Sequence, residues 1–206
     1  MAPLTRLYLG FSQFSDPIWR YFLKKRLQKG KELPDRVAEK SGVSPIPRPS
    51  GDVFWFHALS VGESLALLPL IEKALETSPD AHVVLTTSTA TSVAALKGAG
   101  LPTRAHHVLL PIDTAKATRA FLDHWRPSVA VFAELDFWPR LMIETDRRGI
   151  PLVLINSRMS ESSFASRRRL GGLMRDVLDL FHDLLLQDDP SVDRFVRLGA
   201  SRDRIQ

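Results

Sequence analysis

After residue 52, short apolar runs alternate with segments whose apolar residues have helical spacing. The helical segments predict helices, and Pro69 is expected to kink the first of them or delay its start. Alternation of this kind produces right-handed βαβ units. The predicted fold class is therefore α/β, a Rossmann-like parallel sheet with helices on both faces. The strands are expected at 53–58, 82–87, 105–110, 128–133, 151–156 and 181–186, and the helices at 63–77, 89–98, 114–125, 137–148, 164–178 and 190–198.

Composition excludes several classes of protein. The chain has 206 residues, is 44% hydrophobic and has no cysteine, so disulfide and thiolate chemistry are excluded. No apolar run approaches the roughly 18 residues that span a bilayer, and no signal peptide is visible, so a cytoplasmic location is expected. The motifs G-x-G-x-x-G, Walker A, H-E-x-x-H and G-x-S-x-G are missing. That argues against a dinucleotide oxidoreductase, a P-loop NTPase, a zinc protease and a serine hydrolase, and no metal or cofactor is expected.

The first 40 residues carry the whole net charge of +5, with nine Lys/Arg against four Asp/Glu. Aromatic residues are mixed with these bases, and the pattern from Pro17 to Gly30 predicts a basic helix. Two interpretations stay open, a helix lying on an anionic membrane surface and a helix packed on its own domain. We predict a basic aromatic membrane-associating segment at 1–40, a Pro/Gly/Ser-rich connector at 41–52 and a Rossmann-like domain at 53–206.

The segment from Val53 to Ser64 combines a buried strand, a turn containing Gly62 and the start of a helix. This is the usual place for a polar site in a parallel sheet, because helix-terminal N–H groups point into the crevice there. Near the positive end of the helix dipole, the Glu63 carboxylate is expected to stay ionised and able to accept a proton. Acidic residues are also common in first helical turns as dipole partners alone.

Further polar side chains follow the second, fourth and fifth predicted strands. They share one rim of the sheet, which favours a common site. Each group also has a structural explanation: hydroxyls cap helices, Asp136 could be an N-cap beside a buried Trp138, and Arg167–Arg169 could be a solvated helix face. The side chains are those of Thr87, Ser88 and Thr89, of Glu134, Asp136 and Trp138, and of Asn156, Arg158 and Ser160.

Taken in order, these segments resemble the N-terminal half of 3-deoxy-D-manno-octulosonate (Kdo) transferases. The resemblance covers essentially the whole chain after residue 50. Two positions differ from the family pattern: Asp136 stands where Glu is usual, and the segment after Ser160 lacks the usual Arg. The matching stretches are His57-Ala58-Leu59-Ser60-Val61-Gly62-Glu63, Thr86-Thr87-Ser88-Thr89, Pro111-Ile112-Asp113, Glu134-Leu135-Asp136-Phe137-Trp138-Pro139, Asn156-Ser157-Arg158-Met159-Ser160, Gln187 and Arg194-Phe195-Val196-Arg197-Leu198-Gly199.

The resemblance implies the acceptor-binding half of a two-domain GT-B glycosyltransferase of lipopolysaccharide synthesis, on the cytoplasmic face of the bacterial inner membrane. Such enzymes move Kdo from CMP-Kdo to a lipid A precursor (lipid IVA). Glu63 matches the catalytic base, and the donor-binding C-terminal domain is expected beyond this chain, so that residues 1–206 alone would be inactive. The implied substrate-binding residues are Ser60, Gly62, Thr87, Ser88, Thr89, Glu134, Asp136, Trp138, Asn156, Arg158 and Ser160.

One alternative from a different class remains, a non-catalytic Rossmann-like module that binds anionic lipid. Nucleic acid is not an expected partner, because the bases gather in the N-terminal segment and no RNA-recognition signature is present.

Overall fold

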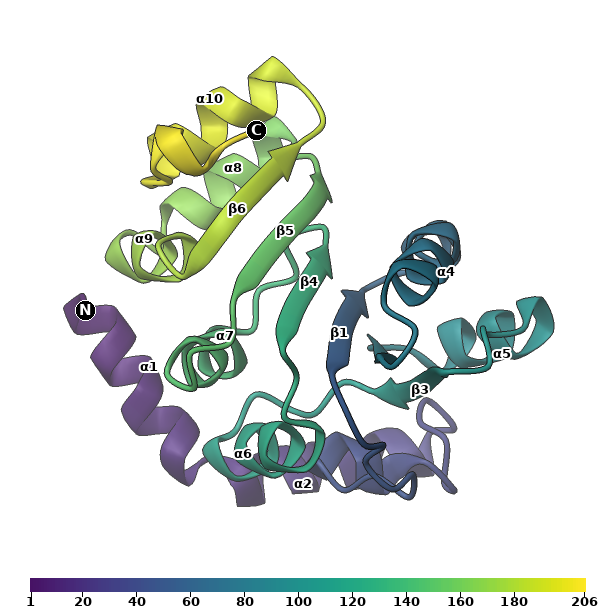
Figure 1. The fold of residues 1–206 in the computed structure, drawn as a ribbon. Helices are drawn as coiled ribbons and strands as arrows, with labels where there is room; N and C mark the ends of the chain where they lie inside the picture. The colour runs from purple at the N-terminus through teal and green to yellow at the C-terminus, as the bar shows by residue number, and fades with distance from the viewer.

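The computed structural model describes residues 1–206, and a single six-stranded parallel sheet forms its centre (Figure 1). The strand order is β3-β2-β1-β4-β5-β6, so the chain runs outward from β1 in one direction and then returns to β1's other side. This is a doubly wound Rossmann-like topology, and the predicted α/β class is confirmed. The strands are β1 (Val53–Ala58), β2 (His82–Thr87), β3 (Ala105–Leu109), β4 (Val129–Ala133), β5 (Leu152–Ser157) and β6 (Phe181–Leu186).

Helices join successive strands and cover both faces of the sheet (Figure 1). Adjacent residues of β1 show why: Trp55 packs on Phe121 in one core, while Phe56 lies with Ile71 in the other. Successive strand side chains point to opposite faces, so a strand that is apolar throughout needs two covering layers. The helices are α3 (Val61–Ala66), α4 (Leu68–Thr77), α5 (Ala90–Ala99), α6 (Ala115–Trp125), α7 (Pro139–Asp146), α8 (Glu161–Arg168), α9 (Gly172–Leu178) and α10 (Asp189–Leu198).

Two predicted helices are divided in the structure. The break between α3 and α4 falls at Leu67, two residues before Pro69, as the position of that proline predicts. The prediction of one continuous helix over 164–178 is wrong. Helix α8 ends at Arg168, and Gly171, whose φ of 50° is left-handed, precedes the start of α9.

The N-terminal residues form α1 (Pro3–Phe14), α2 (Asp16–Gln28) and the 3₁₀ helix η1 (Val37–Ser41), and a second 3₁₀ turn, η2 (Arg202–Arg204), lies at the other end. The predicted basic helix corresponds to α2, whereas α1 was not predicted. Figure 1 shows α1 lying along α7 and α9, with α2 beside α6. No helix is both long enough and apolar enough to cross a membrane.

The segment 41–52 lies against α6. Gly42 has a φ of 78°, and a Cβ atom there would lie 2.2 Å from the carbonyl oxygen of Ala117, so only glycine fits. Arg48 Nε donates to the carbonyl oxygen of Trp125 at 2.9 Å, and the carbonyl oxygen of Ile46 lies 2.9 Å from His124 Nε2. Backbone and side-chain contacts therefore hold this segment on the domain.

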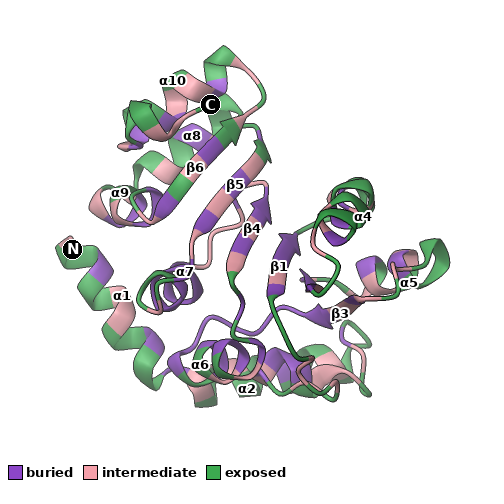
Figure 2. Cartoon of the chain, in the orientation of Figure 1, coloured by how far each residue is buried: buried purple, intermediate pink, exposed green.

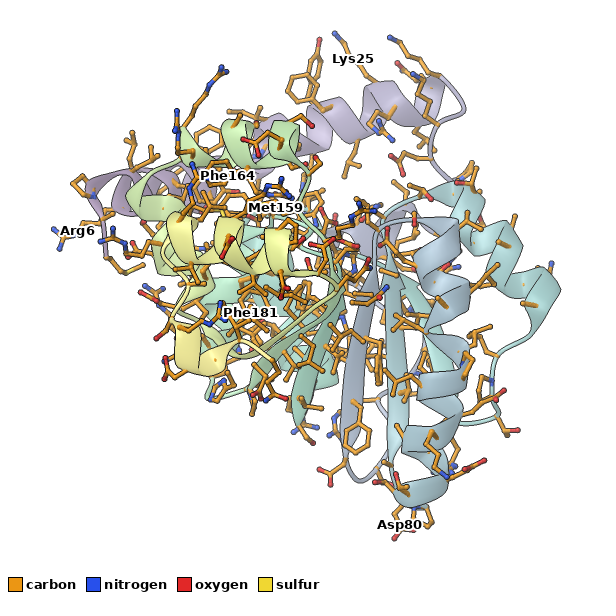
Figure 3. The ribbon with its side chains drawn as sticks, turned by 90° about the horizontal axis from the view of Figure 1, so that it is seen from above. Arg6, Lys25, Asp80, Met159, Phe164 and Phe181 are labelled. Carbon is orange, nitrogen blue, oxygen red and sulfur yellow. The ribbon has the colours of Figure 1, made fainter.

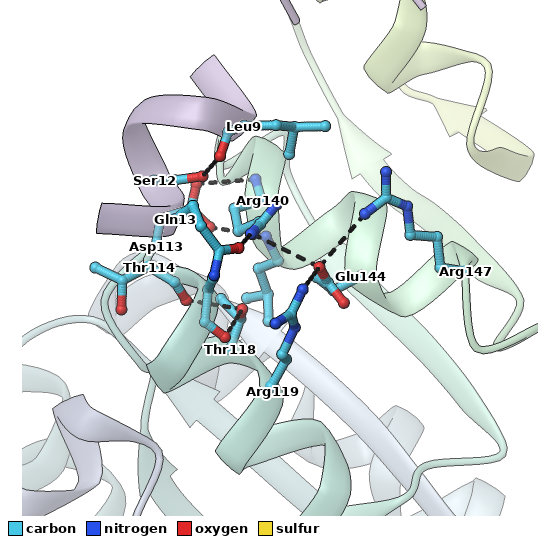
Figure 4. Close-up of polar contacts among 12 residues, drawn as sticks. Leu9, Ser12, Gln13, Asp113, Thr114, Thr118, Arg119, Arg140, Glu144 and Arg147 are labelled. Carbon is cyan, nitrogen blue, oxygen red and sulfur yellow. Dashed lines mark hydrogen bonds and ion pairs between the residues drawn. The ribbon is translucent and has the colours of Figure 1, made fainter. Parts of the chain in front are cut away.

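A buried polar network fastens α1 to the start of α7 (Figure 4). Asp113, which is 2% exposed, accepts hydrogen bonds from the backbone N–H groups of Arg140 and Leu141 at 2.9 and 2.8 Å, and from the Tyr8 hydroxyl. The Arg140 side chain donates to Gln13 Oε1 at 2.6 Å. Asp113 thus caps α7 from a distant part of the chain, a role that helix-start patterns do not reveal.

Candidate functional site at the carboxyl edge of the sheet

The candidate site lies where the strand order reverses, between β1 and β4. Polar segments follow β1, β2, β4 and β5 at their carboxyl ends, and β1 pairs with both β2 and β4. In open α/β sheets this reversal point leaves a crevice in which ligands bind. Figure 2 shows β1 largely buried. Directly beyond this strand, Ser60 is exposed and Glu63 is half-buried.

Glu63 lies in the first turn of α3, directly beyond β1. Its Oε2 atom accepts hydrogen bonds from the backbone N–H of Leu59 at 2.9 Å and of Ser60 at 3.4 Å, and its Oε1 accepts from Ser60 Oγ at 2.7 Å. Ser60 Oγ in turn accepts from the Glu63 backbone N–H, which completes a capping box. The carboxylate is therefore fixed at the helix start and remains partly exposed.

Glu134 faces Glu63 from the end of β4. Burial raises the pKa of the Glu134 carboxyl above its ordinary value, and the nearby charge of Glu63 raises it further. Glu134 also has a φ of 70°, and Asn156 on the neighbouring strand has a φ of 53°. A left-handed backbone costs a non-glycine residue of order 1–3 kcal/mol, and such residues cluster at functional sites. No sequence pattern indicated either conformation.

Asp136 joins His57 to Trp138. His57 is fully buried in β1, and its Nε2 lies 3.0 Å from Asp136 Oδ2, which also accepts from Trp138 Nε1 at 2.6 Å. The expectation that Asp136 could cap α7 is wrong, because Trp138 occupies the N-cap position and Asp113 accepts the helix N–H groups. His57 belongs to this cluster and was missed as a site residue, since a histidine inside an apolar strand resembles ordinary core.

The hydroxyls that follow β2 have separate partners. Thr87 Oγ1 lies 2.9 Å from Nε2 of His107, and Thr89 Oγ1 accepts from the Ser92 backbone N–H as the N-cap of α5. Ser88 Oγ is buried and has no hydrogen-bond partner, while the Ser88 carbonyl oxygen accepts from Lys40 Nζ at 2.9 Å. Lys40 therefore reaches this edge of the sheet from outside the predicted domain.

The residues around the end of β5 form a more exposed group. Gln187 Nε2 donates to Oδ1 of Asn156 at 3.0 Å, and Arg158 pairs with Asp188 at 3.1 Å. Ser160 caps α8 by accepting from the backbone N–H of Ser163 at 3.2 Å. The predicted roles of these residues in binding substrate stay predictions, because their contacts here are also those of ordinary helix caps and surface pairs.

Arg167 lies closer to the site than a solvated helix face would place it. Its Nη2 donates to the carbonyl oxygen of Leu135 at 2.8 Å, inside the loop that carries Glu134 and Asp136. Burial lowers the pKa of its guanidinium, and the charges of Glu134 and Asp136 oppose that effect. Arg167 therefore faces both carboxylates, whereas the adjacent Arg168 is exposed.

The fold resembles solved structures of nucleotide-sugar enzymes. UDP-GlcNAc 2-epimerase from Methanocaldococcus jannaschii aligns with a TM-score of 0.52 at 13% identity, over 76% of this chain and 45% of that one. The UDP-GlcNAc 2-epimerase from Neisseria meningitidis aligns with a TM-score of 0.52 at 11% identity, over 75% of this chain and 46% of that one. At such low identity the likeness concerns the fold alone. The architecture is that of one Rossmann-like half of a GT-B fold.

Sequence relatives are more specific. Residues 28–206 match the family model for 3-deoxy-D-manno-octulosonic-acid transferase, and the chain belongs to this family. A relative from Rickettsia bellii named 3-deoxy-D-manno-octulosonic acid transferase is 32% identical over 198 residues, which are 96% of this chain and 47% of the relative. The one from Chlamydia trachomatis serovar D is 32% identical over 78% of this chain and 37% of its own length. A relative from Arabidopsis thaliana named probable 3-deoxy-D-manno-octulosonic acid transferase, mitochondrial, is 35% identical over 77% of this chain and 35% of its own length. The chain thus spans about half the length of these relatives or less.

Proposed function

We propose that this chain is the acceptor-binding half of a glycosyltransferase of lipopolysaccharide synthesis, which moves Kdo from CMP-Kdo to a lipid A precursor, lipid IVA. Family membership supports the transfer of Kdo. The observation that carries the proposal is the position of Glu63, in the stretch shared with the family and at the point where the strand order reverses.

Glu63 acts as the general base in this proposal. The acceptor hydroxyl gives its proton to the Glu63 carboxylate while its oxygen bonds to the anomeric carbon of Kdo, and the bond from that carbon to the CMP phosphate breaks. The capping-box hydrogen bonds hold the carboxylate in one orientation beside Glu134. Such fixed geometry lowers the cost of bringing base and hydroxyl together. The other residues implied to bind substrate then contact the sugar hydroxyls and phosphate oxygens of the acceptor. They are Ser60, Gly62, Thr87, Ser88, Thr89, Glu134, Asp136, Trp138, Asn156, Arg158 and Ser160.

The N-terminal helices support a location at the cytoplasmic face of the bacterial inner membrane. Helix α1 buries polar side chains and exposes apolar ones, the reverse of the usual pattern in a water-soluble protein. Thr5 and Ser12 are buried, whereas Leu7 and Phe14 are 70% and 81% exposed. Ile18 and Phe22 continue this apolar surface along α2. Figure 3 shows Arg6 and Lys25 pointing away from the body of the domain. Apolar side chains flanked by bases favour an anionic bilayer surface.

The exposed apolar surface of α1 and α2 also fits the second candidate, a module that binds anionic lipid without catalysis. A transfer assay on the complete protein separates the two candidates, because only the transferase releases CMP when CMP-Kdo and a tetra-acylated lipid A precursor are present. Lipid-dependent CMP release supports the transferase, and lipid binding without CMP release supports the module.

The Glu63→Gln variant tests the base. Loss of a general base lowers the rate by about 10²–10⁴-fold, whereas the amide can still accept hydrogen bonds at the helix start, so folding should be retained. Glu161→Gln is the matched control, because Glu161 is exposed and lies in the first turn of α8. Normal turnover by the folded Glu63→Gln protein would contradict the assignment and make Glu134 the next candidate.

A further inference from the structure

A cavity of about 240 Å³ lies beneath α2, beside the carboxyl edge of the sheet. Trp19 and Phe22 of α2 line it on one side, and Ile112 and Trp138 also belong to its lining. Its polar lining residues are Lys40, Ser88, Arg26 and Glu32. Sites that enclose a whole small molecule measure about 300–1,000 Å³. This cavity therefore suits one part of a larger ligand, and Trp138 connects it to Asp136 in the site already described.

Lys40 is the unusual group in this cavity. It is only 7% exposed, its Nζ donates to the Ser88 carbonyl oxygen, and no carboxylate lies within 4 Å of it. Burial lowers the pKa of the Lys40 ammonium, with smaller opposing effects from nearby carboxylates. Buried cations in proteins are normally paired, because an unpaired charge is costly to remove from water. An ammonium has three donors, so two remain for a ligand in the cavity.

Ser88 supplies a second unsatisfied group at the same place. Its Oγ is buried without a hydrogen-bond partner, although buried hydroxyls in proteins are generally hydrogen-bonded. The Lys40 ammonium and the Ser88 hydroxyl together form a polar end that matches an oxyanion, since one brings positive charge and both can donate. The carboxylate of Glu32 also lines the cavity, but it is paired with Arg26 at 2.5 Å.

Most of the α2 residues in the lining are apolar: Trp19, Phe22 and Leu23. Phe22 is 51% exposed at the cavity edge, and Ile18 of the same helix extends the exposed apolar surface described above. A ligand with its anionic oxygen at Lys40 would place an attached hydrocarbon chain between Trp19, Phe22 and Ile112. Aromatic and branched walls of this kind favour hydrocarbon, at roughly 0.8 kcal/mol for each CH₂ removed from water.

We propose that this cavity is a binding subsite for a phosphate-bearing acyl lipid, with the phosphate at Lys40 and Ser88 and the start of an acyl chain against Trp19, Phe22 and Ile112. The proposal rests on the proposed function only in expecting such lipids at this surface. The phosphate could belong to the glycolipid acceptor or to a phospholipid of the surrounding bilayer, and these two sources share the same chemistry.

Direct binding to the complete protein tests the subsite without any sugar transfer. The probe is dihexanoyl phosphatidic acid, used as monomers and followed by tryptophan fluorescence, because Trp19 and Trp138 line the cavity. We expect saturable binding that is weaker by about tenfold or more in Lys40→Gln, the loss expected for one charge-assisted hydrogen bond. Ser88→Ala should weaken binding to a smaller extent. Lys97→Gln is the matched control, because it removes the same charge from an exposed site on α5, away from the cavity and from the basic helix.

Three results would overturn the subsite: equal affinity for dihexanoyl phosphatidylcholine, inorganic phosphate binding as tightly as the lipid, or unchanged affinity in both Lys40→Gln and Ser88→Ala when circular dichroism shows them folded. Competition by lipid IVA at lower concentration than phosphatidic acid would assign the site to the acceptor, and the reverse order would assign it to a membrane phospholipid. If the protein transfers Kdo but Lys40→Gln leaves its affinity for the probe unchanged, the subsite is refuted and the proposed function is not. Probe binding through Lys40 by a protein without transferase activity would refute the proposed function alone.

Discussion

His57 Nε2 lies 3.0 Å from Asp136 Oδ2, although 79 residues separate the two in the sequence. Because a carboxylate oxygen accepts, His57 Nε2 donates to Asp136, and Nδ1 lies 2.9 Å from the Thr86 hydroxyl and 3.1 Å from the Thr86 carbonyl oxygen. Thr86 Oγ1 accepts in turn from Trp55 Nε1 at 2.8 Å. Each side chain in this buried series of hydrogen bonds thereby has a partner. The series ends at Asp136, which lies in the loop that carries Glu134.

The first prediction concerns the Asp136 carboxylate, at the end of this series of hydrogen bonds. Asp136→Ala leaves the N–H groups of His57 and Trp138 without an acceptor, at a cost of about 1–3 kcal/mol in the free energy of unfolding. Asp136→Asn retains an acceptor oxygen and should lose less. Asp146→Ala is the control, since Asp146 is exposed at the end of α7. Urea unfolding measures all three, and an Asp136→Ala protein as stable as the control would contradict the prediction.

The second prediction concerns the attachment of α1 to α7. Asp113→Ala removes a helix cap and the partner of the Tyr8 hydroxyl, so it should destabilise the protein by about 2–3 kcal/mol. Tyr8→Phe removes one hydrogen bond and should cost about 1 kcal/mol. Because the two side chains touch, the double variant should lose less than the sum of the single losses. Thermal unfolding provides the values, and strict additivity would show that the contact contributes nothing.

The third prediction concerns pH. Burial and the charges of Arg36 and Lys40 lower the pKa of His107 from 6.5 to about 3. Below pH 6.5 the unfolded state gains a proton on this histidine, whereas the folded state does not until about pH 3. The free energy of unfolding therefore decreases as the pH is lowered from 6.5 toward 3. One such proton contributes about 1.4 kcal/mol per pH unit. His107→Gln should remove that contribution between pH 6 and 4, and His182→Gln, at an exposed position, serves as control. Equal slopes for wild type and His107→Gln would refute it.

The fourth prediction concerns binding to membranes. Lys24, Lys25 and Lys29 are exposed on and just after α2, and each base near an anionic surface contributes about 1 kcal/mol. Replacing all three by Gln should weaken binding to anionic vesicles by about 100-fold, and salt should weaken the wild-type protein's binding, since charges are screened over about 8–10 Å. The control removes three exposed lysines elsewhere: Lys73, Lys97 and Lys116. Co-sedimentation that is insensitive to salt and equal for neutral vesicles would contradict the electrostatic interpretation.

The positions of the strands could be predicted from the sequence because the relevant signal is local. Strands β1, β2 and β6 have the predicted bounds, and β3, β4 and β5 differ by one residue. Apolar runs of this length with helical segments between them can form little else than a covered parallel sheet. Pro69 predicted the break before α4 for the same reason, since the ring acts on its own turn of helix. The break at Gly171 was missed because one glycine inside a helical pattern is also compatible with a continuous helix.

The site required the tertiary structure. The sequence alone placed Glu63, Glu134 and Asp136 at strand ends, but the pairing of Asp136 with the buried His57 depends on β1 lying beside β4. Likewise, Asp113 caps a helix that begins 26 residues later, and Lys40 reaches Ser88 from outside the sheet. A residue's spacing pattern determines which face of its own helix or strand it occupies. Its polar partner is determined by which elements become neighbours, and that follows from packing the whole chain around one core.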